Sequence, residues 1–186
     1  MSLIPAFEIG VWNAWIPTIL LFLFVMLSGL LPKDIGKRIT PNKEEGKTRR
    51  IMLIVFFAMI IYSIFLPLKV GTIWFYTGLA VYVLGLIISA AALFSIGATK
   101  PDEPFTTGIY RYSRHPIALG TVLPMIGAGI ASASWLFLLL SVILMVISHF
   151  LAIKEEGETT KKFGEAYKQY MARTPMWIGI PKSNIS

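Results

Sequence analysis

Long apolar runs alternate with shorter polar segments along this chain of 186 residues. A helix needs roughly 20 apolar residues to cross a hydrocarbon core about 30 Å thick. Five runs have the composition of membrane-spanning helices, although the second and fourth are short: Val11–Leu31, Ile51–Leu66, Trp74–Ile96, Ile117–Ala131 and Trp135–Ile153. The pattern therefore predicts an all-α integral membrane protein with five transmembrane helices.

Small residues and a proline predict how two of these helices pack. Gly78, Gly85 and Ser89 lie in the third run, where small side chains let another helix approach closely. The fourth run contains Pro124 and several glycines, so we expect it to be bent or sheltered by the rest of the protein.

Basic residues indicate which polar segments face the cytoplasm. All of them except Lys69 lie in residues 32–50, in residues 97–116 or after Ile153. Cytoplasmic segments of membrane proteins carry an excess of lysine and arginine. The three segments are therefore expected in the cytoplasm, which places the N-terminus outside and the C-terminus inside.

Composition narrows the classes of function. Hydrophobic residues make up 55% of the chain and charged residues 15%, which excludes an ordinary soluble domain. The formal net charge of +7 is explained by membrane topology, so no nucleic-acid partner is expected. The chain has no cysteine and only two histidines, so we expect no disulfide and no metal centre. Met1–Gly10 lacks basic residues, so no cleaved signal peptide is expected.

The polar loop before the fourth run is the first candidate site. Proline is favoured in the first turn of a helix, so Pro116 predicts that His115 lies at about the helix N-cap. Free backbone amides at such an end favour an anionic group. Phe105 and Tyr110 add flat aromatic faces for a base or a cation. Anchoring of the loop in the lipid headgroup layer would explain the same residues without a ligand.

Two glutamates directly after the last run are the second candidate. Glu155 and Glu156 are electrostatically unfavourable at an anionic membrane surface unless they bind a cation or hydroxyl groups. Glu156 comes about two helical turns after His149, an ionisable residue within the run. A solvated helix start for the glutamates and an interhelical hydrogen bond for His149 are the alternatives.

The tail over Glu158–Ile180 is predicted to contain an amphipathic helix. Phe163, Tyr167 and Tyr170 fall on one face at helical spacing, and Arg173 lies beside that face. Such a stripe usually packs against other parts of a protein, and here it would close the loop site from below.

Three motifs together resemble a known family. They are Gly108-x-Tyr110-x-x-x-Arg114-His115-Pro116-x-x-x-Gly120, Glu155-Glu156, and Phe163-Gly164-x-x-Tyr167-x-x-Tyr170 with Pro175. Over roughly residues 78–181 the chain is similar to the isoprenylcysteine carboxyl methyltransferases and their phospholipid methyltransferase relatives, and it looks most like a compact prokaryotic member.

The resemblance implies an enzyme that binds S-adenosylmethionine on the cytoplasmic side and methylates the carboxylate of an isoprenylcysteine-like substrate. The residues that match cofactor-binding positions are Phe105, Tyr110, His115, Pro116 and Glu155. We add Glu156 to the cofactor site and expect His115 and Glu156 to position the reactants. His149 and Arg173 are the candidates for substrate binding. Residues 1–70 would form a two-helix membrane segment and residues 71–186 the methyltransferase core.

Two positions depart from the family pattern. Ala118 stands where the family usually has tyrosine, and His149–Ile153 lacks the arginine that the family tends to place one turn before the glutamates. That arginine is associated with the substrate, so the resemblance supports cofactor binding better than it supports substrate identity.

The acceptor group decides whether a catalytic base is needed. A carboxylate is ionised at neutral pH, so its methylation by in-line displacement needs no base. A lipid amine must lose a proton, so N-methylation would need a base such as His149 or Glu156. Two further alternatives are a nicotinamide-dependent reductase of sterol-like lipids and a small scaffold that binds anionic headgroups. The expected partners are a lipophilic small molecule or prenylated peptide and membrane lipids, and the sequence predicts no oligomeric state.

Overall fold

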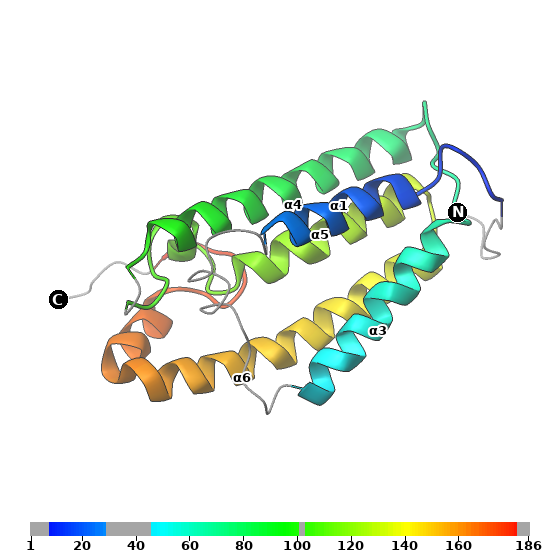
Figure 1. Cartoon of the computed structure of the whole chain (residues 1–186). Coiled ribbons are helices and arrows are strands. Elements are labelled where there is room, and N and C mark those ends of the chain that lie inside the picture. Colours follow the sequence, from blue (N-terminus) through cyan, green and yellow to red (C-terminus); the bar gives the residue numbers. More distant parts are fainter. Residues whose placement is uncertain (1–7, 29–45, 101–102, 182–186) are drawn as a thin grey trace.

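The computed structural model describes residues 8–28, 46–100 and 103–181. Within these ranges the chain is helical, and its only strand-like pairing is an isolated bridge between Asn13 and Pro67. The helices in chain order are α1 (Trp15–Ser28), α3 (Gly46–Ser63), α4 (Ile73–Ala98), the 3-10 helix η2 (Gly108–Arg111), α5 (Pro116–Ala131) and α6 (Trp135–Arg173). In Figure 1, α1, α4 and α5 run side by side, and α3 lies along α6.

Each of the five predicted apolar runs corresponds to one α-helix in the described ranges. The helix α1 begins at Trp15 instead of Val11, and residues 29–31 of that run lie outside the description. The helix α3 begins at Gly46, so its first turns carry basic residues ahead of the apolar stretch. The helices α4 and α6 are long and apolar enough to cross a membrane, and α1 and α5 are shorter apolar helices. Five crossings and the orientation of the termini stay predictions.

The last predicted run and the predicted tail helix form one element. The sequence indicated a span that ends at Ile153 and a separate helix from Glu158, but α6 continues from Trp135 to Arg173. It bends at Gly164, whose φ of 58° lies in the left-handed region that favours glycine. In Figure 1 the chain turns at the orange end of α6 and returns toward η2. The glutamate pair therefore lies in the middle of a continuous helix.

The small residues of α4 pack directly against α5, as the sequence predicted. A Cβ atom added to Gly78 would collide with the backbone of Gly127, and one added to Gly85 would collide with the ring of Pro124. Farther along the pair, Gly120 faces Ser89 at the same close spacing. Such close backbone approach lets helices associate by van der Waals packing where lipid removes the hydrophobic driving force. The pair holds both ends of the loop between α4 and α5 at a fixed separation.

The outer faces of the helices are strongly apolar. Ile54 on α3 is 67% exposed, Phe94 on α4 is 79% exposed and Phe150 on α6 is 57% exposed. Exposed apolar surface on this scale is rare in proteins that are surrounded by water, and it indicates contact with a membrane.

Candidate functional site

The loop after α4 is held against the end of that helix. The N–H of Ile109 donates to the Ser95 hydroxyl at 3.3 Å. Gly108 has a positive φ of 61°, and a Cβ atom there would collide with the Ser95 side chain. Tyr110 is buried in a small cluster with Ala92 and Ile96 of α4. These contacts fix the direction of η2 and of the residues that follow it.

The predicted aromatic pair lies in this docked loop. The rings of Phe105 and Tyr110 are 5.7 Å apart between centroids. Burial first, and then the negative charge of Glu155, raise the pKa of the Tyr110 phenol above its usual range. The phenol of Tyr110 therefore stays protonated at neutral pH and lies within electrostatic range of the glutamate pair.

The start of α5 has the predicted form. His115 is the N-cap residue and Pro116 is in the first turn. The His115 side chain does not cap the helix, because its ring is engaged by two glutamates. The first amides of α5 therefore have no side-chain cap from His115, and they keep the capacity to bind an anion.

Four charged side chains meet between the loop and α6. Oε1 of Glu156 lies 3.0 Å from Nε2 of His115 and 3.1 Å from Nη1 of Arg114. Oε2 of Glu155 lies 3.5 Å from Nδ1 of His115. The side chains of His115, Arg114 and Glu156 are 10%, 14% and 15% exposed, whereas that of Glu155 is 52% exposed. Glu156 therefore holds the loop to α6, whereas the carboxylate oxygens of Glu155 remain accessible as hydrogen-bond acceptors.

The arrangement favours a protonated His115. Burial lowers the pKa of its imidazole, but the hydrogen bonds and negative charges of Glu155 and Glu156 outweigh burial and raise the pKa above its usual value. Both ring nitrogens face carboxylates, which suits an imidazolium that donates from each nitrogen.

Residues 174–181, here called the strap, cross over the loop after α6 ends. The strap explains why the loop and the tail form one site. Three hydrogen bonds tie the strap to the loop: the Arg114 N–H donates to the Pro175 carbonyl at 3.1 Å, the Ser113 hydroxyl to the Met176 carbonyl at 3.4 Å, and the Gly179 N–H to the Tyr112 carbonyl at 3.0 Å.

Trp177 of the strap lies between the two histidines. Its ring centroid is 6.1 Å from that of His115 and 5.9 Å from that of His149. The sequence indicated no role for Trp177 and included Arg114 only as part of a motif. Nothing in the spacing of the chain shows that either side chain contacts the histidine and glutamate cluster, because both contacts are formed between distant segments.

Tyrosines of the bent end of α6 complete the packing. The Tyr170 hydroxyl donates to the Tyr110 carbonyl at 2.7 Å, and the rings of Tyr167 and Tyr170 are 5.6 Å apart. Burial, followed by the charge of Glu156, raises the pKa of Tyr167 to about 12, and burial also raises that of Tyr170. Both phenols are therefore hydrogen-bond donors at neutral pH.

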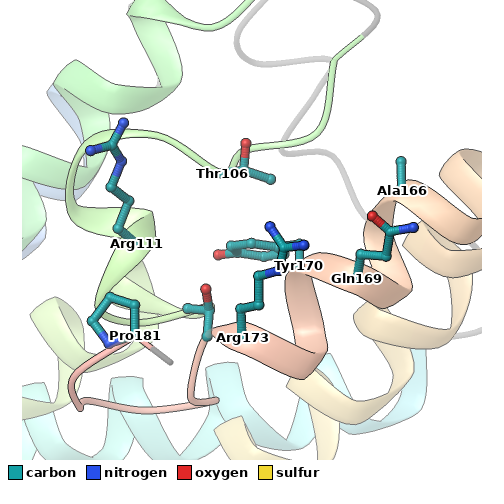
Figure 2. A pocket seen from close by; sticks show the side chains of 8 residues that line it. Thr106, Arg111, Ala166, Gln169, Tyr170, Arg173 and Pro181 are labelled. Atoms are coloured by element: carbon teal, nitrogen blue, oxygen red, sulfur yellow. The ribbon is translucent and has the colours of Figure 1, made fainter. Parts of the chain in front are cut away.

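A cavity of about 540 Å³ lies beside Tyr170, between η2 and the end of α6 (Figure 2). Arg173 lines this cavity, but His149 does not. The two residues predicted to bind substrate are thus on different surfaces: His149 contacts Trp177, and Arg173 faces the cavity. The six residues predicted to bind cofactor do lie together around the loop and the glutamate pair.

A family model described as phospholipid methyltransferase matches residues 73–166. The chain belongs to this family. Neither a curated protein nor a solved structure matches the chain. Family membership and the apolar helices indicate a membrane methyltransferase, and methyltransferases of this family generally use S-adenosylmethionine.

The matched region of the phospholipid methyltransferase family begins with α4 and contains the charge cluster. It ends at Ala166, before Tyr170, Arg173 and the strap. The family match therefore accounts for the loop and the glutamates, whereas the closure of the site from the tail is a finding of the structure.

Proposed function

We propose that the protein transfers a methyl group from S-adenosylmethionine to the carboxylate of an isoprenylcysteine-like lipophilic substrate, at the cytoplasmic face of the membrane. The observation that carries the proposal is the charge cluster between the start of α5 and the middle of α6. His115 lies between two carboxylates, and the nearest aromatic faces belong to Tyr110 and Trp177. The cluster is suited to binding and orienting reactants, and its imidazole is engaged by two carboxylates.

The side chains present fit the cofactor. S-adenosylmethionine, when bound, supplies a sulfonium methyl group that a carboxylate oxygen can displace in line to give a methyl ester. The accessible oxygens of Glu155 suit an ammonium group or ribose hydroxyls, and the amides that follow Pro116 suit a carboxylate. The half-buried ring of Phe105 offers a face for a cation or a purine, and the buried Tyr110 packs behind it. Nε of Arg114 is buried and has no hydrogen-bond partner in the described part of the chain. This N–H can therefore donate a hydrogen bond to a bound ligand.

The protonation state of the cluster favours a carboxylate acceptor. A carboxylate with a pKa of about 4 needs no base at neutral pH. An ammonium acceptor must first lose its proton. Glu155 and Glu156 raise the pKa of His115 and favour its protonated form, which leaves His149 as the candidate histidine base. The residues therefore act by holding both reactants in line and by excluding water, which is the main requirement of such a displacement.

N-methylation of a phospholipid amine is the second candidate, and membership of the matched family is compatible with either reaction. The two reactions differ in their proton balance. Methylation of a carboxylate releases no proton, because the sulfonium and carboxylate charges cancel. Methylation of an ammonium group releases one proton for each methyl group transferred.

The test uses the full-length protein in detergent with methyl-labelled S-adenosylmethionine. The acceptors are N-acetyl-S-farnesylcysteine and phosphatidylethanolamine. We expect label in the farnesylcysteine, release of that label as methanol in base, and no proton release in weakly buffered solution. Base-stable label in phosphatidylethanolamine, with one proton released per methyl group, would establish the second candidate instead.

Site variants test the cofactor residues separately. We expect Glu155→Gln to weaken binding of S-adenosylhomocysteine by about tenfold in calorimetry, since a charge-assisted hydrogen bond contributes about 1.5–3 kcal/mol. Glu165→Gln is the matched control, because Glu165 is exposed on the same helix and pairs with Lys168. Equal affinities of the two variants would contradict the role of Glu155.

A further inference from the structure

The cavity beside Tyr170 has the polar lining of an anion site. Its volume of about 540 Å³ falls within the usual range for small-molecule sites, about 300–1,000 Å³. Its lining has donors on all sides and no carboxylate. The polar side chains are those of Thr106, Arg111, Gln169, Tyr170, Arg173 and Thr174. Figure 2 shows Arg111 from η2 on one side and Arg173 with Tyr170 from α6 on the other.

Neither cavity arginine has a carboxylate partner. Among the described residues, Arg114 pairs with Glu156, but Arg111 and Arg173 form no ion pair. Both arginines are exposed, so their guanidinium groups are accessible to an anion that enters the cavity. Guanidinium groups bind carboxylate and phosphate oxygens with two parallel hydrogen bonds, so these are the matching ligand groups.

The strap gives the cavity an apolar border. Pro181 lines the cavity, and the preceding residues Ile178 and Ile180 are 71% and 90% exposed. Ala166 adds a small apolar patch to the wall. A ligand with an anionic head and an apolar chain satisfies both surfaces, since its head pairs with arginine while its chain lies along the strap.

We propose that this cavity binds the anionic head group of an amphiphile, with Arg111 and Arg173 as its ligands and Ile178 and Ile180 beside its apolar chain. The inference rests on the proposed function in one respect, which is that the carboxylate acceptor is the expected occupant. The same chemistry would accept the phosphate of a lipid.

The test compares ligands that differ only in their head group. The probes are N-acetyl-S-farnesylcysteine, its methyl ester and farnesyl phosphate, and affinity is measured by thermal shift titration of the full chain in a neutral detergent. We expect the two anions to bind at least about tenfold more tightly than the ester, as two charge-assisted contacts predict. In the double variant Arg111→Gln, Arg173→Gln this preference disappears.

Arg50→Gln is the matched control, because Arg50 is an exposed arginine on α3 that does not line the cavity. This variant should keep the preference for anions. Equal affinity of wild-type protein for acid and ester, or a preserved preference in the double variant, overturns the proposal. Weaker binding of S-adenosylhomocysteine by the double variant also overturns it, since the cavity would then belong to the cofactor.

Competition separates the two possible sources of the anion. If farnesyl phosphate inhibits methylation of farnesylcysteine competitively, the acceptor's own head occupies the cavity; if it binds without inhibition, the cavity holds a lipid phosphate. Both outcomes support the anion site. Failure of the proposed function has a different signature, because label would then enter no carboxylate acceptor while the head-group preference in the thermal shift persists.

Discussion

Replacing Glu156 by glutamine tests the buried charge cluster directly. One oxygen of Glu156 accepts from His115 at 3.0 Å and from Arg114 at 3.1 Å, and all three side chains are at most 15% exposed. Removing one partner of a buried ion pair costs about 3–5 kcal/mol. Glutamine keeps the shape and one acceptor, and Glu155 still faces His115, so we expect a loss of about 2 kcal/mol in the free energy of unfolding.

The matched variant is Glu155→Gln, which removes the same charge one residue away. Glu155 is 52% exposed and lies 3.5 Å from the imidazole, so its loss should cost under about 1 kcal/mol. Both variants are measured by reversible denaturation in detergent micelles at a pH of about 6, where the histidine is charged in either state. Equal destabilisation by the two variants would refute the assignment of Glu156 as the buried anchor.

The pH dependence of stability gives a second test of the same cluster. The pKa of His115 is lowered by burial but raised further by Glu155 and Glu156, and its net shift is upward. A raised pKa adds stability that is fully present below about 6.5 and is lost as the pH rises through the folded-state value. The Tm of the wild-type protein should therefore fall between a pH of about 6 and 9, and Glu156→Gln should flatten that fall. A pH-independent Tm in the wild-type protein would contradict the imidazolium assignment.

Four further substitutions are measured with the same unfolding assay. Gly164→Ala should lower the free energy of unfolding by about 1 kcal/mol, because the φ of Gly164 is 58°. Gly157→Ala, in open helical space, should raise the free energy of unfolding by a similar amount. Changes of the same sign in the two variants would contradict the bend. Tyr170→Phe should lose about 1 kcal/mol with its hydrogen bond to the Tyr110 carbonyl, and an unchanged stability would count against that bond. Gly120→Ala should cost about 1–3 kcal/mol by forcing α5 away from α4, and a neutral effect would contradict their close packing.

The elements of the fold follow from local features of the sequence. Apolar runs of helical length predict α1, α3, α4, α5 and the first part of α6, and Pro116 marks the start of α5. The contact between Gly78 and α5 follows from residue size alone. The continuity of α6 was missed because the polar residues after Ile153 suggested a boundary, although Lys154, Glu155 and Glu156 are good helix formers.

The contacts between distant segments in the site could not be predicted in this way. The resemblance placed His115 and Glu155 in one site, but the ion pair of Arg114 with Glu156 joins residues 42 positions apart. The position of Trp177 depends on strap hydrogen bonds whose acceptors are backbone carbonyls, and backbone groups leave no mark in a sequence. The separation of Arg173 from His149 depends on the direction in which α6 turns after Gly164.

Under the proposed function, the continuity of α6 explains how a water-soluble donor meets a lipid-soluble acceptor. The apolar stretch of α6 ends at Ile153, the glutamates follow within three residues, and the bend at Gly164 brings Tyr170 back to the loop. Moving a farnesyl chain of about 15 carbons from lipid into water would cost on the order of 10 kcal/mol at about 0.8 kcal/mol per methylene. A site at the end of the apolar stretch avoids this cost, because only the head group leaves the lipid while the chain stays beside the helices.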